Sequence, residues 1–312
     1  MHGGSLQMQC QDAVNFASLH MKAVVPLNRR CGTGNDKGLP VMSVANLAIL
    51  IRFKNSASTL AGVLSALRRQ TVQPARIIGI DSGSTDESCA MLRAEGAQII
   101  RREGRYHHSK ALNFGMAHCR EEFVLVLSSH TVLEDPTTLD SMLAEISIPG
   151  TACVSGKWAE SDAWSDAITW EEIQRVGLRF CSIYSNSFGM VRRTLWERTP
   201  FDESLVTMED YAWALEQLSR GYTCRRLLFP FRYQRVSHAR EFSFAAITFY
   251  LAHRHGLVVR WLGWKGSVRA VVGGLFQRLC MRHAPIREHV DRLRASLMAT
   301  LSCGRFYPSA ER

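Results

Sequence analysis

Three groups of polar residues in this sequence have types and positions suited to chemistry, and each stands at the edge of an apolar or helical pattern. In chain order they are Asp81, the triplet Ser128, Ser129 and His130, and the pair Glu209 and Asp210. A carboxylate accepts hydrogen bonds and protons, and an imidazole binds a metal ion or carries a proton near neutral pH. These residue types therefore suit the binding and activation of a polar substrate.

The apolar pattern predicts a parallel sheet that positions the first two groups. Four strand-like runs alternate with three helical patterns. The predicted strands are residues 44–51, 76–81, 97–101 and 123–127. Such alternation predicts right-handed crossovers and a parallel sheet. Ligands bind at the carboxyl ends of the strands in open sheets of this kind, so we expect residues 52–55, 81–86 and 128–135 to surround one site.

Further patterns concern the helices. Ser84 and Glu87 have the spacing of a capping box, which predicts that Ser84 caps the second helix. Residues 162–176 read as helical, and Glu209 and Asp210 open a later helix. Acidic residues in a first turn also complement the helix dipole. The local pattern alone therefore leaves the role of this acidic pair open.

Composition and charge limit the classes of protein. The 312 residues are 46% hydrophobic and 21% charged, which is typical of a globular chain. The nine cysteines include no Cys-x-x-Cys pair, which favours a reducing compartment and a cytoplasmic location. The net charge is +10, and residues 250–312 hold eleven Lys and Arg against three Asp and Glu. This basic region suits either a solvated helical surface or contact with anionic lipid at the inner face of a membrane. Nucleic-acid binding is a third alternative for this region, although it contains no base-reading motif.

Four motifs in order give the chain a resemblance to family 2 glycosyltransferases, an inverting class with a single nucleotide-sugar transferase domain. They are "RFKN", "IIGIDSGSTDES", "SKALNFGMAHCREEFVLVL" and "FDESLVTMEDYAWALEQLSRGY". The resemblance implies an α/β, Rossmann-like domain with a mostly parallel sheet and a helical C-terminal extension. The expected division is a poorly ordered extension (1–42), a glycosyltransferase domain (43–240) with a nucleotide-binding half (43–135) and an acceptor half (136–240), and a basic helical C-terminal region (241–312).

On the nucleotide side, the resemblance implies that Asp81 accepts a hydrogen bond from the N3–H of a pyrimidine base. The alternative for Asp81 is a turn-forming role, because "DSGS" is also a typical turn. Ser129 occupies the position that contacts the ribose. The cations Arg52, Lys54 and Lys110 lie on the same expected rim, where they can neutralise a diphosphate, although each by itself is equally consistent with a surface charge.

His130 occupies the position at which similar enzymes hold a divalent metal, Mn²⁺ or Mg²⁺, with an acid. Neutral imidazole suits Mn²⁺ better than Mg²⁺, which prefers oxygen ligands. One alternative is an imidazolium that stabilises the departing diphosphate without a metal. Another is a structural histidine in an inactive site. His238 is a candidate for a second metal ligand.

The resemblance implies that Asp210 is the general base, with Glu209 orienting Asp210 or the acceptor. The predicted function is the inverting transfer of one sugar from a UDP- or dTDP-sugar donor to a hydroxyl of a glycan or lipid-linked acceptor, in cell-surface glycan or glycolipid synthesis. The sequence lacks the Gln-x-x-Arg-Trp motif of processive synthases, which indicates transfer of single sugars. The missing acidic triplet favours an alternative, a non-catalytic sugar-nucleotide-binding protein or inactive partner subunit.

Overall fold

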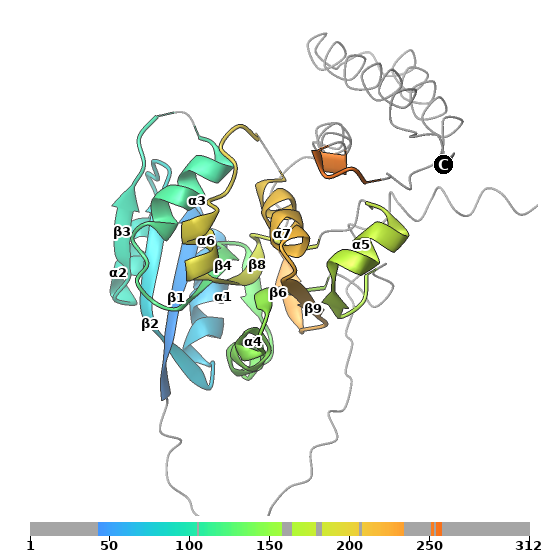
Figure 1. Ribbon diagram of the computed structural model, residues 1–312. Coiled ribbons are helices and arrows are strands. Elements are labelled where there is room, and N and C mark those ends of the chain that lie inside the picture. Colours follow the sequence, from blue (N-terminus) through green and yellow to red (C-terminus); the bar gives the residue numbers. More distant parts are fainter. Residues whose placement is uncertain are drawn as a thin grey trace, which may run out of the picture. The chain divides into compact units, whose positions relative to one another are not determined.

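The computed structural model describes residues 43–104, 106–157, 164–178, 183–205, 208–233, 251–252 and 254–257, and these form an α/β domain with a short later segment (Figure 1). The expected N-terminal extension and nearly all of the expected basic C-terminal region lie outside the described residues. The domain boundaries proposed from the sequence therefore stay predictions. Among the described residues, no helix is both long enough and apolar enough to cross a membrane.

An eight-stranded mixed sheet forms the centre of the domain, in the order β3-β2-β1-β4-β8-β6-β9-β7. Its strands are β1 (Ser43–Phe53), β2 (Val72–Asp81), β3 (Gln98–Arg101), β4 (Phe123–Ser128), β6 (Thr151–Gly156), β7 (Ala167–Ile168), β8 (Phe188–Arg192) and β9 (Thr223–Leu227). β1 runs parallel to β2 and β4, and β2 runs parallel to β3, which confirms the predicted parallel half. β8 is antiparallel to both β4 and β6. A small antiparallel sheet pairs β5 (Thr131–Leu133) with β10 (Phe231–Tyr233).

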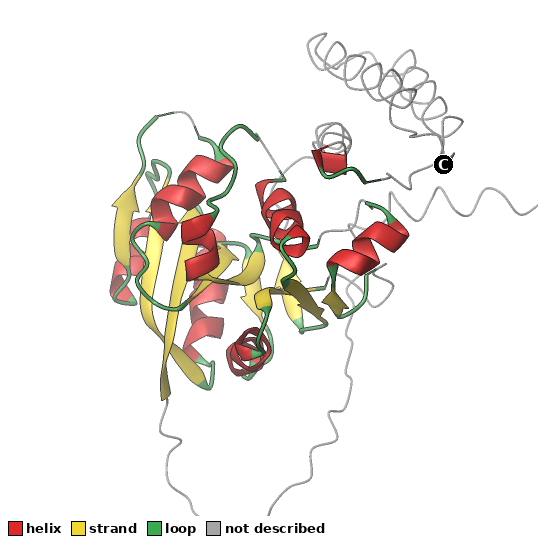
Figure 2. Cartoon of the chain, viewed as in Figure 1, coloured by secondary structure: helices red, strands yellow, loops and turns green. Residues whose placement is uncertain are grey.

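Helices cover both faces of the sheet (Figure 2). The face that carries Leu47, Ile49 and Ile51 of β1 packs against α1 (Ala57–Arg68), α2 (Ser88–Ala94) and α4 (Thr138–Ser147). The opposite face, with Ala48 and Leu50, packs against α3 (His108–Met116), α5 (Trp170–Val176), α6 (Arg193–Arg198) and α7 (Glu209–Ser219). Successive strand residues point to opposite faces, so Arg52 continues the row of Ala48 and Leu50 toward α3 and α7.

Two helical predictions are wrong in detail. The helix predicted over residues 162–176 begins only at Trp170, because β7 precedes it and Thr169 caps its first turn by accepting a hydrogen bond from the Glu172 amide. No side-chain hydrogen bond caps α2 from its N-cap residue Glu87. The Ser84 hydroxyl instead accepts a hydrogen bond from the Asn55 amide at 3.0 Å, a tertiary contact that competes with the capping box.

Candidate active site

The carboxyl ends of β2, β1 and β4 lie in a row, and the turn before β8 adjoins them. Phe53 is paired with Asp81, and Arg52 is paired with Ser128. The Ser128 amide donates a 2.9 Å hydrogen bond to the Ser187 carbonyl oxygen in the turn that leads into β8. Four chain segments that are distant in sequence therefore meet at one edge of the sheet, as expected for an open α/β sheet.

Asp81 ends β2 and is buried, with 2% of its surface exposed. Its Oδ1 accepts hydrogen bonds from the amides of Gly83 at 3.1 Å and Ser84 at 2.8 Å, so the carboxylate shapes the following turn. Gly83 has a φ of +92°, which favours glycine at this position. The other oxygen, Oδ2, lies 4.0 Å from Nε of Arg101. Asp81 thus fulfils the turn-forming role directly, and its contact with a base stays a prediction.

Arg101 is a candidate site residue that the sequence reasoning missed. It is the register partner of Asp81 across β2 and β3, which places a cation beside the buried carboxylate. Its side chain is 66% exposed, so most of the guanidinium faces solvent. The sequence predicted both strands, but it does not fix their register to within one residue. It therefore could not show that Arg101 lies beside Asp81.

The loop after β1 and the turn after β2 are bound together. Asn55 has a left-handed φ of 47°, and its Oδ1 accepts a 2.8 Å hydrogen bond from the Thr85 amide. Asp86 Oδ2 accepts from the Ala57 amide at the start of α1, and its Oδ1 accepts from the Ser88 amide at the start of α2. Hydrogen bonds from Ser88 and Ala57 lower the pKa of Asp86, as expected for a carboxylate at helix N-termini.

The Ser-Ser-His triplet lies against the N-terminal turn of α1. Ser129 is buried, and its hydroxyl donates a 3.0 Å hydrogen bond to the Ser56 hydroxyl, so the predicted ribose contact stays a prediction. The His130 ring is half-buried, with Nδ1 3.1 Å from the Thr59 hydroxyl oxygen. An edge-to-face contact with Tyr233 of β10 holds the ring on its other side, with 6.4 Å between centroids.

Burial lowers the pKa of His130 from its ordinary value of 6.5, so the imidazole is neutral near pH 7. A neutral imidazole can bind Mn²⁺, whereas the alternative role as an imidazolium requires the charged form. Within the described ranges, no three His, Cys, Asp or Glu side chains are grouped to hold a metal ion. Metal binding by His130 therefore stays a prediction. His238 lies outside the described residues.

Glu209 and Asp210 form the first turn of α7, directly after Met208, which has a left-handed φ of 59°. Asp210 Oδ2 accepts a 3.1 Å hydrogen bond from the Asn186 amide, and Oδ1 accepts one from the Tyr211 amide at 2.8 Å. The Glu209 carboxylate is almost fully buried and accepts from Asn186 Nδ2 at 3.3 Å. A single asparagine in the turn before β8 therefore contacts both carboxylates.

Burial raises the pKa of Asp210 to about 7, and repulsion from the adjacent Glu209 acts in the same direction. Hydrogen bonds from the Asn186 and Tyr211 amides and the positive charge of Arg52 oppose this rise. A carboxylate with a pKa near 7 is partly ionised at neutral pH and accepts a proton more readily than an ordinary aspartate. These properties suit Asp210 to accept a proton, and its role as the general base stays a prediction.

Arg52 lies between the strand ends and the acidic pair. Its Nη1 donates to the Tyr106 hydroxyl at 3.1 Å and lies 2.8 Å from His108 Nδ1, and its Nη2 donates to the Asn186 carbonyl oxygen at 3.3 Å. Burial by itself lowers the pKa of Arg52, but Tyr106, Glu209 and Asp210 together raise it above its ordinary value.

The other two cations predicted on the nucleotide rim, Lys54 and Lys110, are exposed. Lys54 follows β1 directly, and Lys110 lies in the first turn of α3. Exposed lysines are consistent both with binding of a diphosphate and with ordinary surface charges, so the predicted role of Lys54 and Lys110 stays a prediction.

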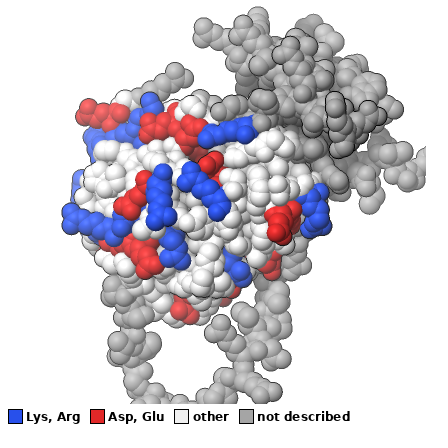
Figure 3. Space-filling model, viewed as in Figure 1, with Lys and Arg blue, Asp and Glu red and all other residues white. Residues whose placement is uncertain are grey.

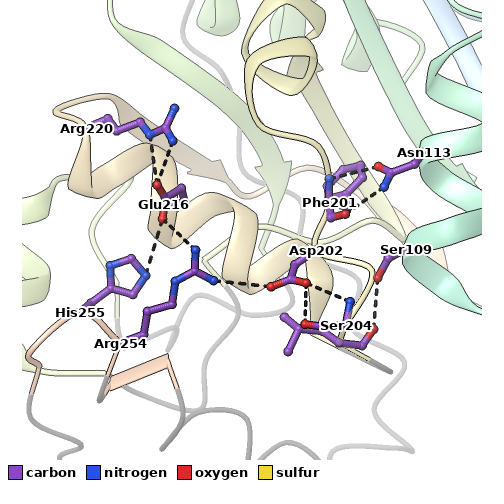
Figure 4. Close-up of polar contacts among 10 residues, drawn as sticks. Ser109, Asn113, Phe201, Asp202, Ser204, Glu216, Arg220, Arg254 and His255 are labelled. Carbon is purple, nitrogen blue, oxygen red and sulfur yellow. Dashed lines mark hydrogen bonds and ion pairs between the residues drawn. The ribbon is translucent and has the colours of Figure 1, made fainter.

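The loop from α6 to α7 is attached to α3, as Figure 4 shows. Asn113 accepts from the Phe201 amide at 3.0 Å and donates to the Phe201 carbonyl oxygen at 2.8 Å, so it pairs with that backbone as a strand residue would. The Ser109 hydroxyl donates to the Leu205 carbonyl oxygen at 3.2 Å. These bonds hold the segment that leads to the acidic pair. Sequence patterns gave no signal for either role, because both residues lie within an ordinary helical stretch.

Residues 48–199 match the family model for glycosyl transferase family 2. The chain is 25% identical over 195 residues to the O-antigen chain rhamnosyltransferase RfbN of Salmonella typhimurium, and 27% identical over 175 residues to the O-antigen chain rhamnosyltransferase WbaN of Salmonella anatum. These matches cover 56% and 50% of this chain and 62% and 55% of the two relatives. The chain thus spans somewhat over half the length of these curated relatives.

Among solved structures, S. aureus TarS 1–349 in complex with UDP-GlcNAc superimposes with a TM-score of 0.58 at 16% identity, covering 81% of each chain. Glucosyl-3-phosphoglycerate synthase from Mycobacterium tuberculosis, in complex with phosphoglyceric acid, gives a TM-score of 0.51 at 15% identity, covering 69% of this chain and 81% of that one. At such identities the likeness shows a shared α/β fold. The family match, which covers just under half of the chain, agrees with the relatives and the fold, and together they support a glycosyltransferase domain of family 2.

Proposed function

We propose that the chain is an inverting glycosyltransferase that moves one sugar from a UDP- or dTDP-sugar to a hydroxyl acceptor in the synthesis of a cell-surface glycan or glycolipid. The observation that carries the proposal is the buried Asp210 carboxylate, which accepts a 3.1 Å hydrogen bond from the Asn186 amide in the turn beside the end of β4. Burial in this position raises its pKa to about 7. The relatives named as O-antigen chain rhamnosyltransferases support a cell-surface glycan as the product.

In the proposed reaction, Asp210 accepts the proton of the acceptor hydroxyl as its oxygen attacks the anomeric carbon. A new carbon–oxygen bond forms on the face opposite the nucleotide, and the bond to the diphosphate oxygen breaks with its electron pair. The configuration at the anomeric carbon is thereby inverted. Glu209, held by Asn186, orients Asp210 and contributes the second negative charge of the pair.

The donor is proposed to lie along the carboxyl ends of β1, β2 and β4. Asp81 is the candidate partner of the pyrimidine base and Ser129 of the ribose, while Lys54 and Lys110 are exposed cations for the diphosphate. His130 is the candidate ligand for a divalent cation, which when bound would neutralise charge on the departing diphosphate.

Replacement of the proposed base tests the function. We expect Asp210→Asn to lower the rate of sugar transfer or donor hydrolysis by about 10²-fold or more, because an amide cannot accept the proton. The assay follows release of UDP or dTDP from UDP-GlcNAc, UDP-glucose and dTDP-rhamnose, with and without Mn²⁺. Asp140→Asn, an exposed aspartate in the first turn of α4, is the matched control and should leave the rate unchanged. Full activity of Asp210→Asn on any of these donors would contradict the proposal.

A second candidate function is a sugar-nucleotide-binding protein without turnover. The Ser-Ser-His triplet favours it, because no acid stands at the position where similar enzymes bind their metal. This alternative predicts that wild type and Asp210→Asn bind UDP equally well and that neither releases it from a sugar donor. The same experiment therefore separates the two candidates.

A further inference from the structure

The negative charges that act on the Arg52 guanidinium are those of the acidic pair, Glu209 and Asp210. Among the described residues, its Nε is buried without a hydrogen-bond partner, and its remaining nitrogens are directed to Tyr106, His108 and the Asn186 backbone. Arg52 as a whole is half-buried, and a negative charge nearby offsets the part of its hydration that is lost.

Asn186 connects the cation to both carboxylates through three separate atoms. Its carbonyl oxygen accepts from Arg52, its amide donates to Asp210, and its side-chain Nδ2 donates to Glu209. Asn186 is itself buried, with 2% of its surface exposed. Arg52 therefore helps to hold the backbone turn that contains Asn186, and this turn holds the side chains of Glu209 and Asp210.

We infer that Arg52 acts as a positioning residue for the acidic pair of α7, through Asn186, and that it does not bind the diphosphate of the donor. The inference deepens the proposed function and rests on it for the catalytic meaning of the pair. Sequence position alone had placed Arg52 on the nucleotide rim with Lys54 and Lys110. The alternation of β1 places its side chain on the α3 and α7 face, where its contacts lie.

Charge balance explains what such a residue does for catalysis. The positive charge of Arg52 acts on both carboxylates, and it offsets part of their mutual repulsion when Asp210 releases its proton. Without Arg52, the same release leaves two adjacent uncompensated carboxylates in a buried site, which is more costly. Arg52 therefore favours the ionised form of Asp210 that accepts the proton of the acceptor hydroxyl.

Other ionisable groups also face this cluster. Tyr106 and His108 contact Arg52 from the segment at the start of α3, Tyr184 approaches from the turn before β8, and Cys153 adjoins Tyr184 from β6. Burial raises the pKa of both Tyr184 and Cys153 well above the ordinary values, so these two are neutral near pH 7. Among the described groups whose charges act on Asp210, the positive one is Arg52, which stays charged at every ordinary pH.

A carboxyl titration without substrate tests this inference. In wild-type protein labelled with ¹³C at aspartate and glutamate carboxyls, the Asp210 signal is assigned by its loss in Asp210→Asn. We expect Arg52→Met to raise the pKa of Asp210 by about one unit. Arg52→Lys, which keeps the charge, should restore most of the wild-type value. Arg192→Met is the matched control, because Arg192 also lies in the sheet and pairs with Glu122 at the opposite edge.

A parallel titration calorimetry experiment measures binding of UDP. We expect the dissociation constant of Arg52→Met to stay within about threefold of wild type, because the inferred role does not involve the diphosphate. A loss of UDP affinity of tenfold or more with an unchanged Asp210 titration would overturn the inference and assign Arg52 to the phosphates. The carboxyl titration needs no sugar donor. Failure of the wild type to turn over any donor would thus contradict the proposed function without affecting this test.

Circular dichroism first establishes that each variant is folded. If Arg52→Met does not fold, Arg52→Lys and Asn186→Ala decide the question. Asn186→Ala keeps the backbone donor to Asp210 but removes the side-chain donor to Glu209. The pair should then hold its shared proton more tightly, with an upward shift in its titration. An unchanged titration in Asn186→Ala would overturn the inference.

Discussion

Asp210 couples the stability of the protein to pH, because its carboxyl is buried next to a second acid. The pKa of Asp210 is about 7 in the folded protein, against an ordinary value of 3.8. Between these two values the folded protein holds a proton that the unfolded chain has released. The free energy of unfolding contributed by this group therefore falls as the pH rises from about 4 to about 7, and stays low above that.

Asp210→Asn should remove this dependence. Because the amide does not ionise, we expect the variant to gain stability relative to wild type as the pH rises from 4 to 8, with most of the change below pH 7. Urea unfolding at a series of pH values measures the difference directly. Asp140→Asn serves again as the exposed control and should show no such trend. A difference between Asp210→Asn and wild type that is constant with pH would refute the raised pKa.

At the scale of elements, the entry into β8 places Asn186, and this depends on a glycine. A Cβ added to Gly189 would lie 2.3 Å from the Tyr184 ring and 2.5 Å from the Ser185 carbonyl oxygen. The carbonyl is backbone and cannot move aside without shifting the turn. The close packing of this strand against the turn therefore holds the residues that contact the acidic pair.

Two glycine-to-alanine substitutions should have opposite effects. Gly189→Ala forces the Tyr184 ring and the Ser185 backbone apart, so we expect a loss of about 1–3 kcal/mol in unfolding free energy, together with reduced transfer activity. Gly62→Ala, within α1, meets only Val132 Cγ2 at 3.4 Å and replaces a poor helix former. We expect it to stabilise the protein by up to about 1 kcal/mol. Guanidinium unfolding compares the two variants, and equal effects would contradict this account of the turn.

At the scale of the whole molecule, a short segment from the C-terminal side packs on α7. Leu251 and Ala252 are buried in the core, and Arg254 and His255 lie 3.9 Å from the Glu216 carboxylate (Figure 4). Arg254 also lies 3.5 Å from Asp202 in the loop that leads to the acidic pair. The segment therefore contacts both the helix and the loop that position the candidate base.

Glu216→Gln should weaken this attachment. The glutamate forms ion pairs with Arg220 and Arg254, and loss of its charge removes both. It also lies 3.9 Å from His255, whose pKa is lowered by burial. The two arginines are nearly half exposed and Glu216 is 22% exposed, so solvent screens the pairs and we expect a loss of only about 1 kcal/mol, smaller at high salt. Hydrogen exchange should increase at residues 251–252 and 254–257 while β1 and β2 stay protected. Glu122→Gln, whose pair with Arg192 lies elsewhere, is the control. Unchanged exchange in the segment would show that apolar packing alone holds it.

Positive and negative side chains are interspersed over the face shown in Figure 3, so this view shows no single-sign patch among the described residues. The basic excess noted in the sequence falls in residues 250–312, most of which lie outside the described part. Contact between this region and a membrane accordingly stays a prediction.

The sequence by itself determined the parallel half of the sheet, its flanking helices and the location of Asp81, His130 and Asp210 at the ends of elements. These features follow from periodicity and local turn chemistry, which are written in residues close together in the chain. Three other features could not be predicted from these local patterns. They are the antiparallel placement of β8, the late start of α5 and the hydrogen bond from Asn55 to Ser84.

Only the tertiary structure decided which residues share the candidate site. Asn186, Arg101, Ser109 and Asn113 stand in unremarkable local patterns, and their roles arise from contacts with partners distant in the sequence. The same holds for Arg52. Its position at the end of a strand was predicted from the sequence, but its neighbours depend on which face of the sheet its side chain lies on. Burial and charge depend on the whole surroundings of a side chain, so the raised pKa of Asp210 exists only once the chain is folded.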